Sequence, residues 1–145
     1  MQSLFIIIFV GLIGGIAIGL QSPMSSILGN KLGLMEGAFI VHFSGAVAAS
    51  IPLLIWSGGN LAKWRDVPWY TLGAGAFGLI VVSALSFIIP KVGVAPALIL
   101  LVLGQLVVGA VLDHYGLLGA EIRPLTYQRL MGLLVVMAGV WLTVR

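Results

Sequence analysis

The residues best suited to chemistry lie in segment 104–119, where a glutamine and an Asp-His pair interrupt an apolar sequence. Gln105 lies roughly 12 Å from Asp113 along a helix that rises about 1.5 Å per residue. Because successive helical residues turn by about 100°, Gln105, Gly109 and Asp113 share one broad face. This face suits a helix that faces protein or water. The alternative is a polar helix contact with an acid that reaches the lipid headgroups.

Composition places the chain among integral membrane proteins. Of its 145 residues, 61% are apolar and 8% are charged, whereas a soluble domain carries about a quarter charged residues. We therefore predict an all-α membrane protein with a single domain over residues 1–145. The chain has no cysteine, which excludes disulfides, thiolate nucleophiles and cysteine metal sites. The formal charge of +3 comes from scattered residues, so nucleic-acid binding is not expected.

Five apolar segments are long enough to predict membrane-spanning helices, at approximately 4–28, 34–56, 69–89, 94–113 and 126–144. The polar, glycine-rich stretch 21–33 is expected to connect the first two, with Pro23 kinking or ending the first helix. Segment 57–68 is expected to be a loop at headgroup level. A cleaved signal peptide is the alternative for the first segment, but its start lacks Lys and Arg and no cleavage pattern follows.

Further polar side chains lie within or beside the predicted spans. His42 and Ser44 lie inside the second span, and Gln21 precedes Pro23. A buried imidazole is costly unless it is partnered, and histidine can exchange a proton near neutral pH. His42 and Asp113 are therefore the candidates for proton coupling. The alternative for His42 is a hydrogen bond to a neighbouring backbone group.

Small residues recur at helical spacing and predict faces for close helix packing. Gly11, Gly15 and Gly19 follow one another every four residues, and Gly45 lies four residues before Ala49. Such ridges let another helix backbone approach closely. They carry no information about a solute.

The loop charges are almost balanced between the two sides of the membrane. With five spans, four basic residues (Lys63, Arg65, Arg123 and Arg129) lie on the side of the N-terminus, and three (Lys31, Lys91 and Arg145) lie opposite. Since Lys and Arg asymmetry sets orientation, this balance permits insertion in both directions. Two oppositely inserted copies would form an inverted repeat around a midplane site, as in many secondary transporters.

Four groups of residues carry a resemblance to a known family: Leu20-Gln21 with Leu28-Gly29 and Leu32-Gly33; His42-Phe43-Ser44-Gly45; Gly104-Gln105 with Asp113-His114-Tyr115-Gly116-Leu117; and Arg129-Leu130-Met131-Gly132 with Ala138-Gly139-Val140. Over nearly its whole length the chain resembles the YdcZ-like, five-span branch of the drug/metabolite transporter superfamily. One position departs from the pattern, because Ser25 stands where the family is expected to carry asparagine. The resemblance implies half of a ten-helix bundle in a bacterial inner membrane. A homodimer, which could be antiparallel, or a paired homologue would complete it.

We predict a secondary transporter of a small organic solute or metabolite. The candidate substrate-binding or gating residues are Gln21, His42, Ser44, Gln105, Asp113 and His114. The alternative is a small structural or regulatory membrane subunit whose glycine faces bind partner helices. An enzyme is disfavoured because no nucleophile elbow, paired catalytic carboxylates or metal-ligand cluster accompanies Asp113 and His114. No cofactor or metal is expected.

Overall fold

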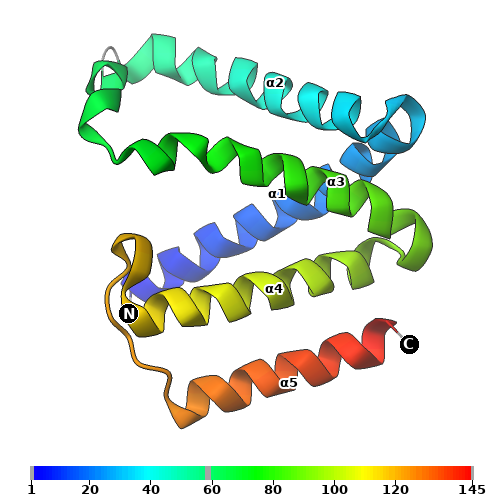
Figure 1. The fold of residues 1–145 in the computed structure, drawn as a ribbon, viewed down its shortest axis with the longest axis vertical. Coiled ribbons are helices and arrows are strands. Elements are labelled where there is room, and N and C mark those ends of the chain that lie inside the picture. Colours follow the sequence, from blue (N-terminus) through cyan, green and yellow to red (C-terminus); the bar gives the residue numbers. More distant parts are fainter. Residues whose placement is uncertain (1, 58–59, 145) are drawn as a thin grey trace. The chain divides into compact units, whose positions relative to one another are not determined.

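The computed structural model describes residues 2–57 and 60–144, which are mostly helical and contain no strand (Figure 1). This confirms the predicted all-α class. Contacts divide the chain into two compact units, Met1–Lys91 and Val92–Arg145. The first unit contains α1 (Gln2–Leu32), α2 (Leu34–Pro52) and α3 (Ala74–Val92), and the second contains α4 (Val94–Tyr115) and α5 (Tyr127–Val144).

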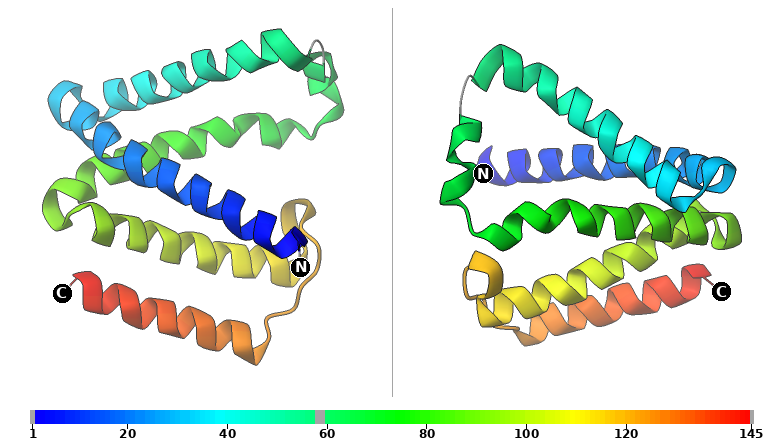
Figure 2. Two further views of the ribbon diagram at one scale, coloured as in Figure 1. Left: turned by 180° about the vertical axis from the view of Figure 1, so that it is seen from behind. Right: turned by 45° about the horizontal axis from the view of Figure 1, so that its top comes forward.

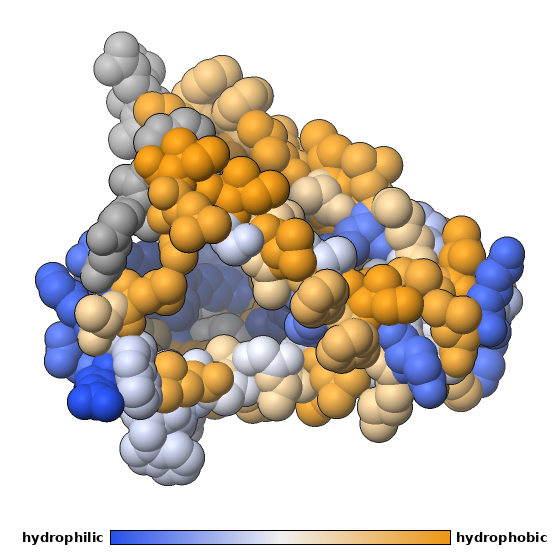
Figure 3. Space-filling view, turned by 90° about the horizontal axis from the view of Figure 1, so that it is seen from above, coloured by the Kyte–Doolittle hydropathy of each residue, from blue (hydrophilic) through white to orange (hydrophobic). Residues whose placement is uncertain are grey.

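Four of the described helical segments are long and apolar enough to cross a membrane: Leu4–Leu32, Leu34–Ile55, Trp69–Val92 and Val94–Tyr115. The apolar part of α5, Tyr127–Thr143, is shorter. At about 1.5 Å per residue it reaches roughly 26 Å, slightly less than the hydrocarbon core of about 30 Å. A membrane bundle is thus supported, and the fifth crossing stays a prediction. Hydrophilic residues gather at the helix ends and apolar ones cover the lengths between (Figure 3).

The expected connection over 21–33 is wrong, because α1 continues through Pro23 as far as Leu32. Ser22 and Ser25 hydrogen-bond inside the helix: the Ser22 hydroxyl donates to the Ile18 carbonyl (2.6 Å) and the Ser25 hydroxyl to the Gln21 carbonyl (3.0 Å). Both serines are buried, so their polarity serves helix packing rather than a solvated loop.

Single glycines make the tight turns between α1 and α2 and between α3 and α4. Gly33 (φ 118°) separates α1 from α2, and Gly93 (φ 92°) separates α3 from α4. Only glycine adopts such angles readily. The turn expected at 90–93 is therefore shorter than predicted, because α3 continues through Pro90. The expected loop 57–68 is also partly helical, with a 3₁₀ helix over Asn60–Asp66.

A close crossing of small residues holds the first unit together, where α1 to α3 meet at the Gly33 end of α1 and diverge toward its other end (Figures 1 and 2). Gly37 of α2 lies directly against the backbone of Gly29 in α1. On α3, the Ser86 hydroxyl lies 3.0 Å from the Ser25 carbonyl, and the Asn30 amide donates to the Ser86 carbonyl (3.2 Å). Small residues and interhelical hydrogen bonds are the usual means of helix association in membranes.

The second unit is a helical hairpin, in which α4 and α5 run antiparallel and are joined by residues 116–126 (Figure 1). α4 ends at Gly116, which adopts the left-handed conformation (φ 63°) and donates its N–H to the Leu112 carbonyl. The loop turns again at Gly119 (φ 85°). This hairpin positions the Gln105–Asp113 face against α5.

Candidate functional site

A groove of about 460 Å³ lies between α4 and α5, and we call it the α4–α5 groove. Gln105, Gly109 and Asp113 line its α4 wall, as the helical period predicts. The rest of its lining is Leu106, Ala110, Leu125, Arg129, Gly132, Leu133 and Val136. The groove is thus apolar along most of its length, with one amide and one pair of opposite charges.

Gln105 carries the polar group of this groove that lies nearest the middle of α4. It lies roughly 16 Å along α4 from Val94, at about 1.5 Å per residue, and its side chain is exposed. It forms no hydrogen bond with any other residue that the structure describes. In hydrocarbon an unbonded amide costs several kcal/mol. In a membrane the amide therefore requires a partner that the described residues do not supply.

Asp113 forms an ion pair with Arg129 at the loop end of the α4–α5 groove. The Arg129 Nη1 atom lies 3.5 Å from the Asp113 Oδ2 atom, and both side chains are 42% exposed. Arg129 was not among the residues predicted for the site. An available signal was the short connection after Asp113, because a hairpin brings the end of one helix beside the start of the next.

His114 lies outside the α4–α5 groove, although Asp113 beside it lines the wall. The backbone N–H of Leu125 donates to its Nδ1 atom (3.1 Å), and its ring contacts the edge of the Tyr115 ring. An accepting Nδ1 carries no proton. His114 therefore fastens the loop, rather than presenting a polar atom to the groove.

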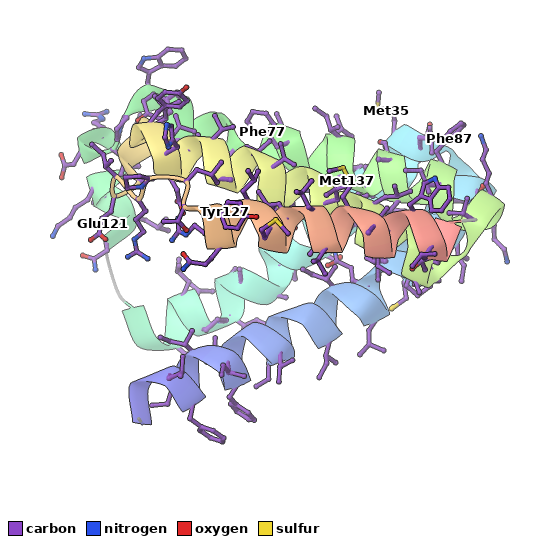
Figure 4. All side chains as sticks on the ribbon, turned by 90° about the horizontal axis from the view of Figure 1, so that it is seen from below. Met35, Phe77, Phe87, Glu121, Tyr127 and Met137 are labelled. Carbon is purple, nitrogen blue, oxygen red and sulfur yellow. The ribbon has the colours of Figure 1, made fainter. Side chains whose placement is uncertain are left out.

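The loop also carries an exposed ion pair at the end of the hairpin where α5 begins (Figure 4). The Arg123 guanidinium lies 2.9 Å from a Glu121 carboxylate oxygen. This hydrogen bond, together with charge attraction, lowers the pKa of Glu121 and raises the pKa of Arg123. Both groups are exposed, so water screens the pair and it contributes little to stability.

A second groove, of about 640 Å³, lies between α1 and α2, and we call it the α1–α2 groove. Gln21 and Ser44 both line it, so the structure brings these two candidates together. The Ser44 hydroxyl donates to the Val41 carbonyl (3.0 Å), whereas the Gln21 amide bonds no other described residue. The residues lining this groove carry no charge: Ala17, Leu20, Gln21, Met24, Ser25, Leu28, Val41, Ser44, Gly45 and Ala48.

His42 lies away from this groove, between α2 and α3. Its Nδ1 atom is 2.7 Å from the Ala38 carbonyl oxygen, and its Nε2 atom lies against Gly78 of α3. A carbonyl can only accept, so Nδ1 donates this hydrogen bond. A hydrogen bond to a neighbouring backbone group was the alternative to proton coupling for His42, and the structure contains such a bond. A role of His42 in transport stays a prediction.

The glycines used for close packing differ from those that the sequence pattern suggested. A Cβ atom added at Gly11, Gly15, Gly19 or Gly45 would meet no atom within 4 Å. The close contacts instead involve Gly29, Gly37 and Gly78. The four predicted glycines remain open to another helix, so their packing role stays a prediction.

Among the described residues, no group of three or more His, Asp or Glu side chains is arranged to hold a metal ion. The polar side chains that line the two grooves can form hydrogen bonds and ion pairs.

A protein-family model matches residues 6–142 of the chain, a range that includes the residues lining both grooves. The family is described as "Putative inner membrane exporter, YdcZ". No curated protein and no solved structure matches the chain.

Proposed function

We propose that this chain, which belongs to the YdcZ family of inner membrane exporters, carries a small organic solute out across the inner membrane. The solute would move along the α4–α5 groove. The transport would be secondary, since the sequence offers no nucleotide-binding motif to drive it. The groove volume of about 460 Å³ lies within the range of about 300–1,000 Å³ found for small-molecule sites.

The observation that carries this proposal is the exposed Gln105 amide in that groove. A polar group at this depth persists in a membrane helix when it faces a partner, a solute or a water path. An apolar groove with a few fixed polar groups is the usual form of a small-molecule site. We infer that Gln105 contacts the solute and that Asp113 and Arg129 lie at one end of its path.

Both grooves are open on one side, so we propose that a second copy of the chain completes them. A homodimer would provide the ten helices that the family resemblance implies, and a paired homologue is the other way to supply them. The near-balance of basic residues supports an antiparallel arrangement.

Dual topology predicts that C-terminal reporters report from both sides of the membrane. A cytoplasmic reporter and a periplasmic reporter, each fused after Arg145, should both be active. Two lysines added to loop 57–68 should shift the population strongly toward one reporter, because the native balance is only four to three. A single orientation in the unmodified chain would contradict the antiparallel dimer and require a parallel assembly or a partner chain.

Transport itself is tested with purified protein. A library of small organic solutes is screened by thermal shift, since specific binding raises the unfolding temperature by mass action. Each binder is then loaded into liposomes with the protein, and its release is compared with that from protein-free liposomes. We expect at least one binder to be released faster. A protein that binds and moves none of them would favour the structural or regulatory subunit.

That alternative function has its own support in the open ridge of Gly11, Gly15 and Gly19 on α1. No described atom lies within 4 Å of a Cβ added at any of them, so a partner helix could pack there. Co-purification of a different membrane protein that is lost on Gly15→Leu, with no solute transport, would favour this role.

Proton coupling is expected to depend on His42 and Asp113. Proton-driven transport in liposomes should fall at least about 10-fold in His42→Gln and in Asp113→Asn, because neither replacement can exchange a proton. Solute exchange without a proton gradient should persist in both. Asp66→Asn is the control, since Asp66 lies in an exposed 3₁₀ helix and lines neither groove. Proton-driven transport that survives both substitutions would remove these residues from the mechanism.

A further inference from the structure

The loop after α4 is held against the hairpin by three hydrogen bonds. The Arg123 N–H donates to the Asp113 carbonyl (2.7 Å), and the Arg129 guanidinium donates to the Arg123 carbonyl (3.3 Å). The Leu125 N–H donates to His114 Nδ1 (3.1 Å). Of these contacts, the one to His114 depends on a side chain whose ability to accept changes with pH.

Leu125 connects this contact to the α4–α5 groove. Its side chain lines the groove beside Asp113 and Arg129, while its backbone N–H is bonded to His114. The position of this part of the groove wall therefore depends on a hydrogen bond made outside the groove.

We propose that His114 is a pH-dependent latch that positions Leu125 at the end of the α4–α5 groove. The neutral imidazole accepts the Leu125 N–H at Nδ1 and holds the loop closed. Protonation turns Nδ1 into a donor, so the two N–H groups face each other and the bond is lost. Closure therefore weakens as the pH falls through the range in which histidine side chains change charge.

The charged side chains at this end of the hairpin are balanced while the His114 imidazole is neutral. Asp113 on α4 and Glu121 in the loop are acidic, whereas Arg123 in the loop and Arg129 on α5 are basic. Asp113 and Glu121 are already paired with the two arginines. The neighbouring titratable groups, Tyr115 and Tyr127, are phenols that are uncharged in this pH range. A protonated His114 thus adds a third cation to a neutral set, without a free carboxylate to hold it in place.

The inference that the latch controls solute access rests on the proposed function. Opening of the latch can nevertheless be measured without any transport. The chain has no cysteine and only two histidines. A single nitroxide spin label at Ile122→Cys, which is 72% exposed, therefore reports loop mobility, and a label at Leu61→Cys, 65% exposed, is the control in the other unit.

In membranes, the mobile fraction of the Ile122 label should rise about two- to twelve-fold between pH 8 and pH 5, the equilibrium equivalent of losing one hydrogen bond. The Leu61 label should not respond. His114→Gln, whose amide oxygen can still accept, should remain immobile at both pH values. His114→Lys, which is charged and has no acceptor, should remain mobile at both.

The matched control is His42→Gln, which removes the other imidazole and should leave the response of the Ile122 label intact. A wild-type label without a pH response would overturn the latch. A response that persists in His114→Gln, or equal mobility in the Gln and Lys variants, would do the same. If the label responds as expected but no solute is transported, the proposed function fails and the latch stands.

Discussion

Replacing Gln105 with leucine is expected to reduce solute transport by at least about 5-fold while the chain remains folded. The amide lies exposed in the α4–α5 groove and bonds no other described residue, so its removal leaves no protein group unpaired. A solute that hydrogen-bonds it would lose that bond, and an unmet polar group costs about 1–3 kcal/mol, or roughly 5- to 150-fold in binding. Release of the identified solute from liposomes measures the effect.

Gln128→Leu is the matched control, because it makes the same chemical change at an exposed position near the start of α5 that does not line the groove. It should transport normally. Helicity and the unfolding temperature in detergent should be similar for both variants. Normal transport by the Gln105→Leu protein would mean that the amide serves helix packing.

Adding one methyl group at Gly37 is expected to destabilise the first unit by about 1–3 kcal/mol, the usual cost of overpacking. The Cβ atom of Gly37→Ala would lie 2.7 Å from the Gly29 nitrogen and 2.9 Å from the Gly29 Cα atom. Both are backbone atoms, so α1 and α2 must separate to accept it. The unfolding transition in detergent, monitored by helicity, measures the change.

Gly45→Ala provides the control on the same helix, where an added Cβ atom meets nothing within 4 Å. Alanine favours a helix over glycine by up to about 1 kcal/mol, so this variant should be as stable as the parent or slightly more so. The two substitutions are chemically identical and should have opposite signs. Equal unfolding temperatures would show that the Gly29–Gly37 crossing does not hold the unit together.

Much of the fold could be predicted because the bilayer restricts the choices of an apolar chain. A lipid-exposed backbone must satisfy its own hydrogen bonds, so long apolar segments become helices. The starts of α2 and α4 were accordingly predicted closely. The prediction failed at 21–33, where serines and a proline suggested a connection. These residues are compatible with a helix when neighbouring helices bury them. Burial by a neighbouring helix cannot be recognised from the local sequence.

Part of the candidate site could also be predicted, because a helical period of 3.6 residues is a local property. It places Gln105, Gly109 and Asp113 on one face, and the structure finds all three lining one groove. The pairing of Gln21 with Ser44 in the α1–α2 groove required a neighbouring helix. No spacing within one segment indicates it.

By itself, the sequence determined that this is a helical membrane protein with amides and an acid set within its spans, since hydropathy and helical periodicity are read from neighbouring residues. Only the tertiary structure decided which groups are partners. In the structure, Asp113 forms an ion pair with Arg129. His114 hydrogen-bonds the backbone of Leu125, and His42 hydrogen-bonds the backbone of Ala38. Gly37, rather than Gly45, packs against a neighbouring helix. The reason is that partner choice depends on where helices cross and how a loop returns. Those positions follow from contacts between residues distant in the sequence.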